Sequence, residues 1–449
     1  MSPRKSAPKN MSDEDRLSKN KRIKKTLEAT RKRRSTMDCK VFQLKVSKTR
    51  LNGQQNEALD RLFLEAKWVR NALIASGDFT RDNLKNFRDT VPVHTPDGVD
   101  RRDIRVLGGQ IAQGVLSEIK TNLRQLSSLK KNGRKVGGLK FCQGITSIDF
   151  VQAGNSWKLN NDNSTVKLAN IPGWIKVRGL KQIPEGAELG NAKLVRRASG
   201  LYIHITTFIP KVEKDVQPGT VIGVDMGVST GLTLSDGSKI NVAFGESERL
   251  RRLRRKLNRQ VKGSNKYNKT WELIKRELEK NTRRKNDAAN KIVHELAKNE
   301  RIFFQDDNVS SWKNKKSKAR GSKRIHSGIL GRVKSQLKML DNAVCLDRFE
   351  PTTQLCVCGA KNKHTLDKRV YRCACGFTAD RDVHAALNMI RIGSALKQEN
   401  SPGLEQTRTP VEFPVRPAEM SFADIAVGAG TVKREAARSS ASPQFTDGR

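Results

Sequence analysis

Apolar residues recur along this chain with two spacings, one typical of strands and one typical of helices. Residues 40–46 and 145–210 alternate apolar and polar positions between turn residues, which predicts β-strands. Residues 59–73 and 111–123 place apolar residues three or four positions apart, which predicts two helices that each bury one face. We therefore expect a small β-barrel or sandwich with a helical insertion after its first strand.

Residues 220–237 read T-V-I-G-V-D-M-G-V-S-T-G-L-T-L-S-D-G, which predicts a buried strand, a turn and a second strand. Asp225 lies inside the first strand, where an unpaired charge is costly. Gly223 and Gly227 leave room for another group to approach the backbone. Two interpretations fit: Asp225 helps to hold a metal ion, or it accepts hydrogen bonds from a turn at a strand end.

The next segment, residues 246–300, is predicted to be helical and is very basic. Leu250, Leu253 and Leu257 form one apolar stripe, and cations fill most other positions. A solvated charged face is one interpretation, but the excess of one sign favours contact with phosphate groups. The cations that we assign to nucleic-acid binding are Arg249, Arg251, Arg252, Arg254, Arg255, Lys256 and Arg259.

Composition and charge narrow the class of partner. The 449 residues include 88 Lys plus Arg against 46 Asp plus Glu, a formal net charge of +42. Such a balance implies a polyanionic partner, with nucleic acid first and an acidic membrane surface second. No apolar run reaches the length of about 18 residues that predicts a membrane span, and the N-terminus lacks the apolar core of a secretory signal. We therefore expect an intracellular protein.

Four of the seven cysteines fall in two close pairs, each followed by glycine: C-V-C-G and C-A-C-G. Four thiolates so arranged predict a tetrahedral zinc site formed by Cys356, Cys358, Cys373 and Cys375. His364, between the pairs, is the less favoured ligand. The isolated Cys39, Cys142 and Cys345 are expected to be buried thiols.

After the second pair, A-D-R-D-V-H-A-A-L-N-M is typical of the start of a helix with acidic residues in its first turn. Asp380 suits the N-cap position. Asp382 then has no capping role to fill, so it is the better candidate for a functional acid.

Together these motifs resemble the TnpB family of transposon-encoded nucleases with a RuvC-type site, which is related to Fanzor proteins and type V CRISPR effectors. The matching pieces occur in order as G-V-D-M-G, the basic helices, I-F-F-Q-D-D-N, T-T-Q-L-C-V-C-G, C-A-C-G and D-R-D-V-H-A-A-L-N-M. The resemblance covers about residues 38–396. It implies an α/β, RNase H-like (RuvC) nuclease domain with an inserted zinc ribbon, plus an N-terminal β-barrel that carries a helical insertion.

The resemblance also implies boundaries. In the N-terminal half we expect a basic disordered arm at 1–37 (or a basic helix that orders on nucleic acid), then a β-barrel at 38–212 with a helical recognition insertion at about 52–135. The first part of the nuclease core follows at 213–351, and a zinc ribbon occupies 352–377. The last core helix lies at 378–396, and a disordered tail at 397–449.

Sites of this family use clustered carboxylates to hold two divalent ions, and oxygen ligands suit Mg²⁺ or Mn²⁺. Asp225 and Asp382 match two of the family acids. The chain departs from the pattern at Gln305, where the family commonly has glutamate. Glu350 is our first choice for the third catalytic acid and metal ligand, because some members supply the glutamate from that later place. Asp307 and Asp306 are the alternatives.

The implied function is RNA-guided DNA cleavage beside a short flanking motif, with a guide RNA from the transposon end and double-stranded DNA as partners. A nuclease-inactive, guide-dependent DNA-binding protein stays open because of Gln305, and a strand-joining transposase is a third hypothesis. No membrane partner is expected. The expected location is the bacterial cytoplasm or nucleoid, or the nucleus if the source is eukaryotic or viral.

Overall fold

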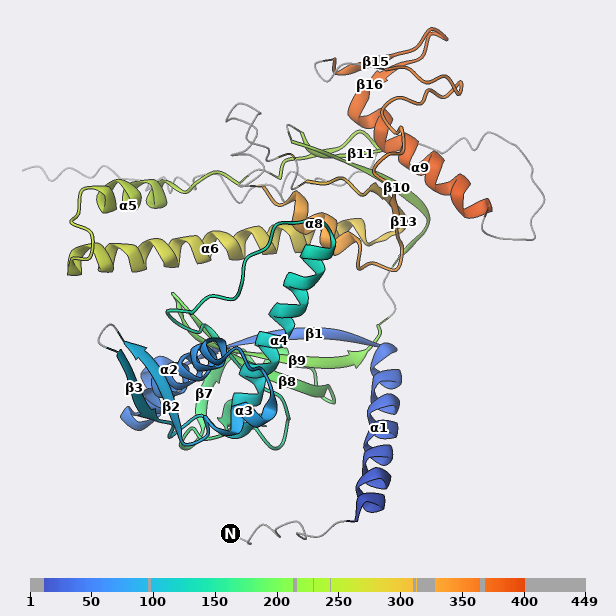
Figure 1. Cartoon of the computed structure of the whole chain (residues 1–449). Helices are drawn as coiled ribbons and strands as arrows, with labels where there is room; N and C mark the ends of the chain where they lie inside the picture. The colour runs from blue at the N-terminus through green and yellow to red at the C-terminus, as the bar shows by residue number, and fades with distance from the viewer. Residues whose placement is uncertain are drawn as a thin grey trace, which may run out of the picture. The chain divides into compact units, whose positions relative to one another are not determined.

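The computed structural model (Figure 1) describes residues 12–399, apart from 96–97, 213–215, 229, 243, 310–311, 313–327 and 364–367. The chain forms two compact units, Met1–Glu213 and Lys214–Arg449. His364 and the tail beyond residue 399 lie outside the described residues. Within the described ranges, none of the helices combines the length and apolar character needed to cross a membrane.

The first unit is built on one antiparallel sheet of seven strands, in the order β4-β8-β9-β1-β7-β6-β5. Its longest pairing joins β1 (Met37–Val46) to β9 (Gly200–Pro210). The other strands are β4 (Ser147–Phe150), β5 (Trp157–Asn160), β6 (Thr165–Leu168), β7 (Ile175–Arg178) and β8 (Glu188–Arg197). The strands predicted from alternation at 40–46 and within 145–210 are therefore present.

The segment between β1 and β4 is mainly helical, with α2 (Gly53–Ser76), the short α3 (Arg81–Lys85) and α4 (Gly109–Lys131). The apolar faces predicted for the two long helices are buried in the core of this unit. A hairpin of β2 (Thr90–Thr95) and β3 (Gly98–Asp103) was not predicted. All six residues of β3 are exposed, so its sequence shows no apolar alternation.

The prediction of a disordered arm at residues 1–37 is wrong for the described part of that segment. Residues Asp13–Ser35 form helix α1, which starts at the N-cap Ser12. Its last turn is fixed to the sheet, because Arg33 and Arg34 form ion pairs with Glu188 at 2.9 and 2.8 Å. The open alternative, a basic helix, matches the observed structure.

The second unit contains a five-stranded sheet in the order β12-β11-β10-β13-β14. Strands β10 (Gln217–Gly227), β11 (Gly231–Leu234) and β12 (Lys239–Ile240) are antiparallel, whereas β13 (Asn299–Gln305) and β14 (Ala343–Leu346) run parallel to β10. The crossover between β12 and β13 contains α5 (Glu248–Asn258) and α6 (Asn265–Leu296), and α8 (Leu330–Leu337) precedes β14. Such crossovers are what parallel strands require.

Helices cover both faces of this sheet. On β13, Ile302 and Phe304 pack with residues of α6 and α8, while the alternate residue Phe303 packs with α9 (Arg381–Glu399). Successive side chains of a strand point to opposite faces of the sheet, so neighbouring residues of β13 contact different helices. Figure 1 shows α9 beside β10 and β11. The strand that carries Asp225 is thus enclosed between layers, which accounts for the partial burial of this acid.

Candidate active site and metal centre

Asp225 is a half-buried carboxylate in the central strand of the second unit. Burial, followed by the negative charges of Asp382 and Asp307, raises the pKa of Asp225 from 3.8 to about 7. The positive charge of Arg381 opposes this shift. Two acids from separate segments, Asp382 and Asp307, therefore lie close enough to act on Asp225.

Asp382 is the second residue of α9 and only 8% exposed. Its backbone N–H donates to Asp380 Oδ1 at 2.9 Å, so the capping role considered for Asp380 is confirmed. Thr230 Oγ1 donates to Asp382 Oδ2 at 3.4 Å. The guanidinium groups of Arg369 and Arg381 approach the same carboxylate at 3.7 and 3.5 Å. The side chain of Asp382 is thus held by one hydroxyl and two guanidinium groups, and it does not itself cap the helix.

Two glycines allow α9 to pack closely against the sheet. A Cβ on Gly223 would stand 2.0 Å from the backbone oxygen of Ala386, and a Cβ on Gly393 would stand 2.2 Å from Phe303 Cδ1. Real side chains do not tolerate such distances, so any other residue at either position would push the helix away. This close packing brings Asp382 towards Asp225.

Gln305, at the position where the resemblance led us to expect glutamate, ends β13 and is 7% exposed. Its Nε2 donates to the backbone oxygens of Asp347 and Glu350, at 3.0 and 2.8 Å. Its Oε1 accepts from Thr352 Oγ1 at 3.2 Å. All three partners belong to the segment between β14 and the cysteine pairs, so the neutral side chain fixes the loop that carries Glu350.

The two aspartates after Gln305 have different surroundings. Asp306 lies 2.5 Å from Lys334 Nζ and 2.7 Å from Lys338 Nζ, and these bonds lower its pKa to about 2. Burial raises the pKa of Asp307, although Lys334 opposes the shift. The two lysines thus compensate the charge of Asp306. Asp307 is therefore the acid of this pair whose charge raises the pKa of Asp225.

The carboxylates are near enough to interact, but they do not form a tight cluster. Among the described residues, the four cysteines are the only group of three or more ligand atoms that all lie within 4.8 Å of one another. The structure brings Asp225, Asp382 and Asp307 into electrostatic contact, and it anchors the backbone of Glu350 at the end of β13. Carboxylate oxygens from several segments are a donor set that fits Mg²⁺ or Mn²⁺.

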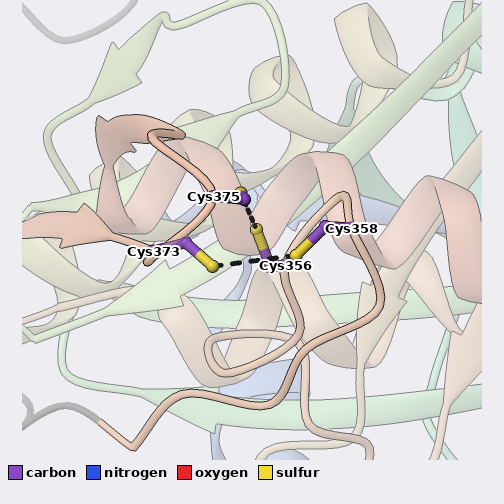
Figure 2. A group of neighbouring side chains, drawn as sticks. All are labelled: Cys356, Cys358, Cys373 and Cys375. Atoms are coloured by element: carbon purple, nitrogen blue, oxygen red, sulfur yellow. Dashed lines mark hydrogen bonds between the residues drawn. The ribbon is translucent and has the colours of Figure 1, made fainter.

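The four predicted zinc ligands come together from two loops (Figure 2). The Sγ atoms of Cys356 and Cys375 are 3.6 Å apart, and those of Cys358 and Cys373 are 3.7 Å apart. Four sulfurs placed at about 2.3 Å around a tetrahedral zinc ion would be separated by about 3.8 Å. The spacing therefore fits a structural zinc ion held by all four thiolates.

The two cysteine loops have the same backbone design. Gly359 N–H donates to the oxygen of Cys356 at 3.1 Å, and Gly376 N–H donates to the oxygen of Cys373 at 3.0 Å. Both glycines have left-handed φ values, +86° and +89°. This conformation favours glycine, which explains the repeated C-x-C-G pattern.

The cysteine loops are attached to the helix that carries Asp382. The hairpin of β15 (Val370–Arg372) and β16 (Thr378–Asp380) buries Tyr371, whose ring centroid lies 4.1 Å from that of His384 in α9. His384 Nε2 donates to the backbone oxygen of Leu355 at 2.8 Å. A metal in the cysteine cluster would therefore also stabilise the start of α9.

The predicted basic surface lies on α5, where the seven assigned cations are all exposed. Leu250 is buried, as the apolar stripe predicted. Ion pairs with acids engage Arg252, Arg254 and Arg249. Near the end of the helix, a cavity of about 480 Å³ is lined by Arg252, Arg255, Lys256, Arg259 and Gln260. Four cations around one cavity suit a phosphate group.

The sequence interpretation missed the buried polar side chains that connect these segments. Asn388 is 1% exposed, and its Nδ2 donates to the backbone oxygens of Thr352 and Leu355, both at 2.7 Å. The sequence did contain an indication: His384 and Asn388 are four residues apart within the mainly apolar stretch V-H-A-A-L-N-M, so they share one helix face.

Family profiles match two parts of the chain. A family described as "Probable transposase" matches residues 204–301, and one described as "Cas12f1-like, TNB domain" matches residues 336–389. The first match contains Asp225 and the basic helices, and the second contains Glu350, the four cysteines and Asp382.

Two relatives are named as RNA-guided DNA endonucleases. The protein from Streptomyces pristinaespiralis is 26% identical over 277 residues, which cover 59% of this chain and 67% of the relative. InsQ from Escherichia coli (strain K12) is 28% identical over 269 residues, which cover 53% of this chain and 64% of the relative. The chain thus spans about two thirds of the length of these relatives. A cryo-EM structure of a Cas12f1–sgRNA–target DNA complex aligns over 79% of this chain and 99% of that chain, with 15% identity and a TM-score of 0.42.

Proposed function

We propose that this TnpB-family nuclease is an RNA-guided DNA endonuclease that cleaves target DNA by divalent-metal-dependent hydrolysis. The observation that carries the proposal is the half-buried Asp225 in the central strand, whose pKa is raised to about 7 by desolvation and by the nearby charges of Asp382 and Asp307. A partly desolvated carboxylate that faces two other acids destabilises a protein unless a cation compensates its charge. Because the relatives are named as RNA-guided DNA endonucleases, we infer that the cation would serve DNA cleavage.

In this proposal the second unit is an RNase H-like core, with its three antiparallel strands followed by two parallel ones. Asp225, Asp382 and Glu350 would hold Mg²⁺ or Mn²⁺. The bound ions would activate a water molecule and stabilise the leaving oxygen of the phosphodiester. Asp225 contributes from the central strand and Asp382 from the first turn of α9. Glu350 contributes from a loop whose backbone Gln305 fixes, and Asp307 is the alternative third acid.

The chain's own cations would bind the nucleic acids. Its net charge of +42 suits two polyanionic partners, a guide RNA made from the transposon end and the target DNA. The exposed cations of α5, with the cavity lined by Arg252, Arg255, Lys256 and Arg259, would contact the phosphate backbone. Recognition of a short flanking motif would fall to protein side chains.

The zinc ribbon has a structural role in this proposal. It lies between the loop of Glu350 and the helix of Asp382, and it contacts α9 through Tyr371 and His384. Zinc bound by four thiolates has no open position for substrate, so it would order these two segments rather than catalyse.

The decisive experiment is cleavage of a plasmid that matches the RNA copurifying with the protein. Mg²⁺ or Mn²⁺ should support cleavage, EDTA should stop it, and a plasmid without the matching sequence should stay intact. A protein that binds the matched plasmid but never cuts it with either metal would instead be a guide-dependent DNA-binding protein.

A further inference from the structure

Gln305 stands where the family resemblance predicts an acid, but its contacts give it another role. We propose that Gln305 is a positioning residue: its amide holds the loop that carries Glu350, and a glutamate at position 305 would disturb the site instead of restoring it. This inference rests on the proposed function, since it takes Glu350 as a metal ligand.

The contacts of Gln305 require an amide. A primary amide offers two N–H donors, and the oxygens of Asp347 and Glu350 use both, at 3.0 and 2.8 Å. An ionised carboxylate has no donor, so glutamate would place its oxygens against these two carbonyl oxygens. The side chain is only 7% exposed, so little water can compensate for that repulsion. The loop would have to move, and Glu350 with it.

The same loop is held from the other side by α9. Thr352 Oγ1 donates to Gln305 Oε1 at 3.2 Å, and Asn388 Nδ2 donates to the oxygen of Thr352 at 2.7 Å. Thr352 and Asn388 are 2% and 1% exposed. A continuous chain of buried hydrogen bonds therefore links the end of β13 to the helix that carries Asp382. Gln305 fixes Glu350 relative to elements that hold the other two acids.

The chain offers a matched control. Gln55, in the first unit, is 5% exposed, and its Nε2 donates to the backbone oxygens of Pro172 and Trp174 at 2.9 and 3.2 Å. Gln55→Glu makes the same chemical change in an equivalent setting, remote from the carboxylates along the chain. It reports the general cost of replacing a buried amide by a carboxylate.

Binding of Mn²⁺ to the guide-free full chain, measured by electron paramagnetic resonance, tests the proposal without cleavage. Gln305→Glu should weaken Mn²⁺ binding by about 10–100-fold, the usual effect of losing a group that orients a ligand. Gln305→Met, which keeps the size but removes the hydrogen bonds, should do the same. Glu350→Ala should weaken binding at least as much, and Gln55→Glu should leave it unchanged.

Several results would overturn the inference. Tighter Mn²⁺ binding by Gln305→Glu would mean that a carboxylate at position 305 ligates the metal directly, and unchanged binding would mean that the amide does not position Glu350. If Gln305→Met or Glu350→Ala bound Mn²⁺ as tightly as the wild type, the positioning role would be refuted. Equal losses of Mn²⁺ affinity in Gln305→Glu and Gln55→Glu would refute it as well. Failure of the proposed function is a separate outcome: the wild type would not cut matched DNA although the Mn²⁺ pattern holds.

Discussion

Gly223 and Ala386 lie so close together that a Cβ on the glycine would stand 2.0 Å from the alanine's backbone oxygen. The contact joins the strand of Asp225 to the helix of Asp382. Both acids sit within four residues of it, so the distance between the carboxylates depends on this absence of a side chain.

Gly223→Ala should therefore separate the two acids. We expect it to lower the free energy of unfolding by about 1–3 kcal/mol, as overpacking does, and to reduce cleavage far more than guide-dependent DNA binding. Thermal unfolding and single-turnover cleavage would measure both effects. Gly245→Ala is the control, because a Cβ there meets nothing within 4 Å. Normal cleavage by Gly223→Ala would show that the helix position is unimportant.

Asp225→Asn should stabilise the metal-free protein at alkaline pH. The folded protein keeps the proton on Asp225 up to about pH 7, whereas the unfolded chain releases it near 3.8. The free energy of unfolding should therefore fall as pH rises through this window, by up to about 4 kcal/mol. The variant should melt above the wild type at pH 8 in EDTA and together with it near pH 4.

The control for this pH effect is Asp162→Asn, which changes an exposed carboxylate in the first unit. It should melt with the wild type at both pH values. Equal melting of Asp225→Asn and wild type at pH 8 would contradict the raised pKa.

The third acid can be decided by substitution. Asp225→Ala and Asp382→Ala should each reduce cleavage by at least about 100-fold and leave guide-dependent binding intact, because a lost ligand costs more than a lost supporting group. Glu350→Ala should behave in the same way. Asp307→Ala should still cut, with the pH dependence moved to lower pH because a negative charge near Asp225 is removed. If Glu350→Ala cuts normally and Asp307→Ala does not, the acid lies after β13 instead.

Zinc should copurify at about one ion per chain, since four thiolates complete a tetrahedral site. Cys356→Ser should lose the metal and lower the melting temperature, because Cys356 is fully buried between the ribbon loops. Cys345→Ser, outside the cluster, should keep zinc and serves as the control. Active wild-type protein without zinc in metal analysis would refute the assignment.

DNA or RNA binding should weaken steeply with salt. Replacing Arg255, Lys256 and Arg259 by glutamine should reduce the slope of log affinity against log salt by about 0.7–0.9 per lost phosphate contact. Lys291→Gln is a suitable control, because Lys291 pairs with Asp287 on α6 at 3.1 Å. An unchanged slope in the triple variant would mean that this end of α5 faces solvent in the complex.

Local patterns predicted the elements whose burial alternates regularly. They include the strand of Asp225, the two long helices of the first unit and the paired cysteines. Each could be found because side-chain period and ligand spacing can be read from residues that are close in sequence. The hairpin at residues 90–103 could not, since β3 is exposed along its length. Residues 13–35 were expected to be disordered but form helix α1. Composition alone does not reveal that Glu188 anchors Arg33 and Arg34.

The site was less predictable than the fold, because its contacts join distant segments. Asp225 and Asp382 could be selected from their surroundings in the sequence, and their electrostatic contact appears only in the folded chain. The sequence showed that Gln305 lacks a charge, but it could not show that Asp347, Glu350 and Thr352 surround its amide. Whether a polar residue is a lost ligand or a support depends on partners more than 40 positions away.

The late position of α9 has a consequence for synthesis. Thr230, in the turn after the strand of Asp225, contacts Asp382 across 152 positions. A ribosome that adds roughly 5–20 residues per second would need on the order of 10 s to pass from one to the other. For most of that interval the nascent chain already contains the cations of α5, yet it lacks the last carboxylate. In the proposed function, a growing polypeptide would therefore be able to hold nucleic acid before it could cut DNA.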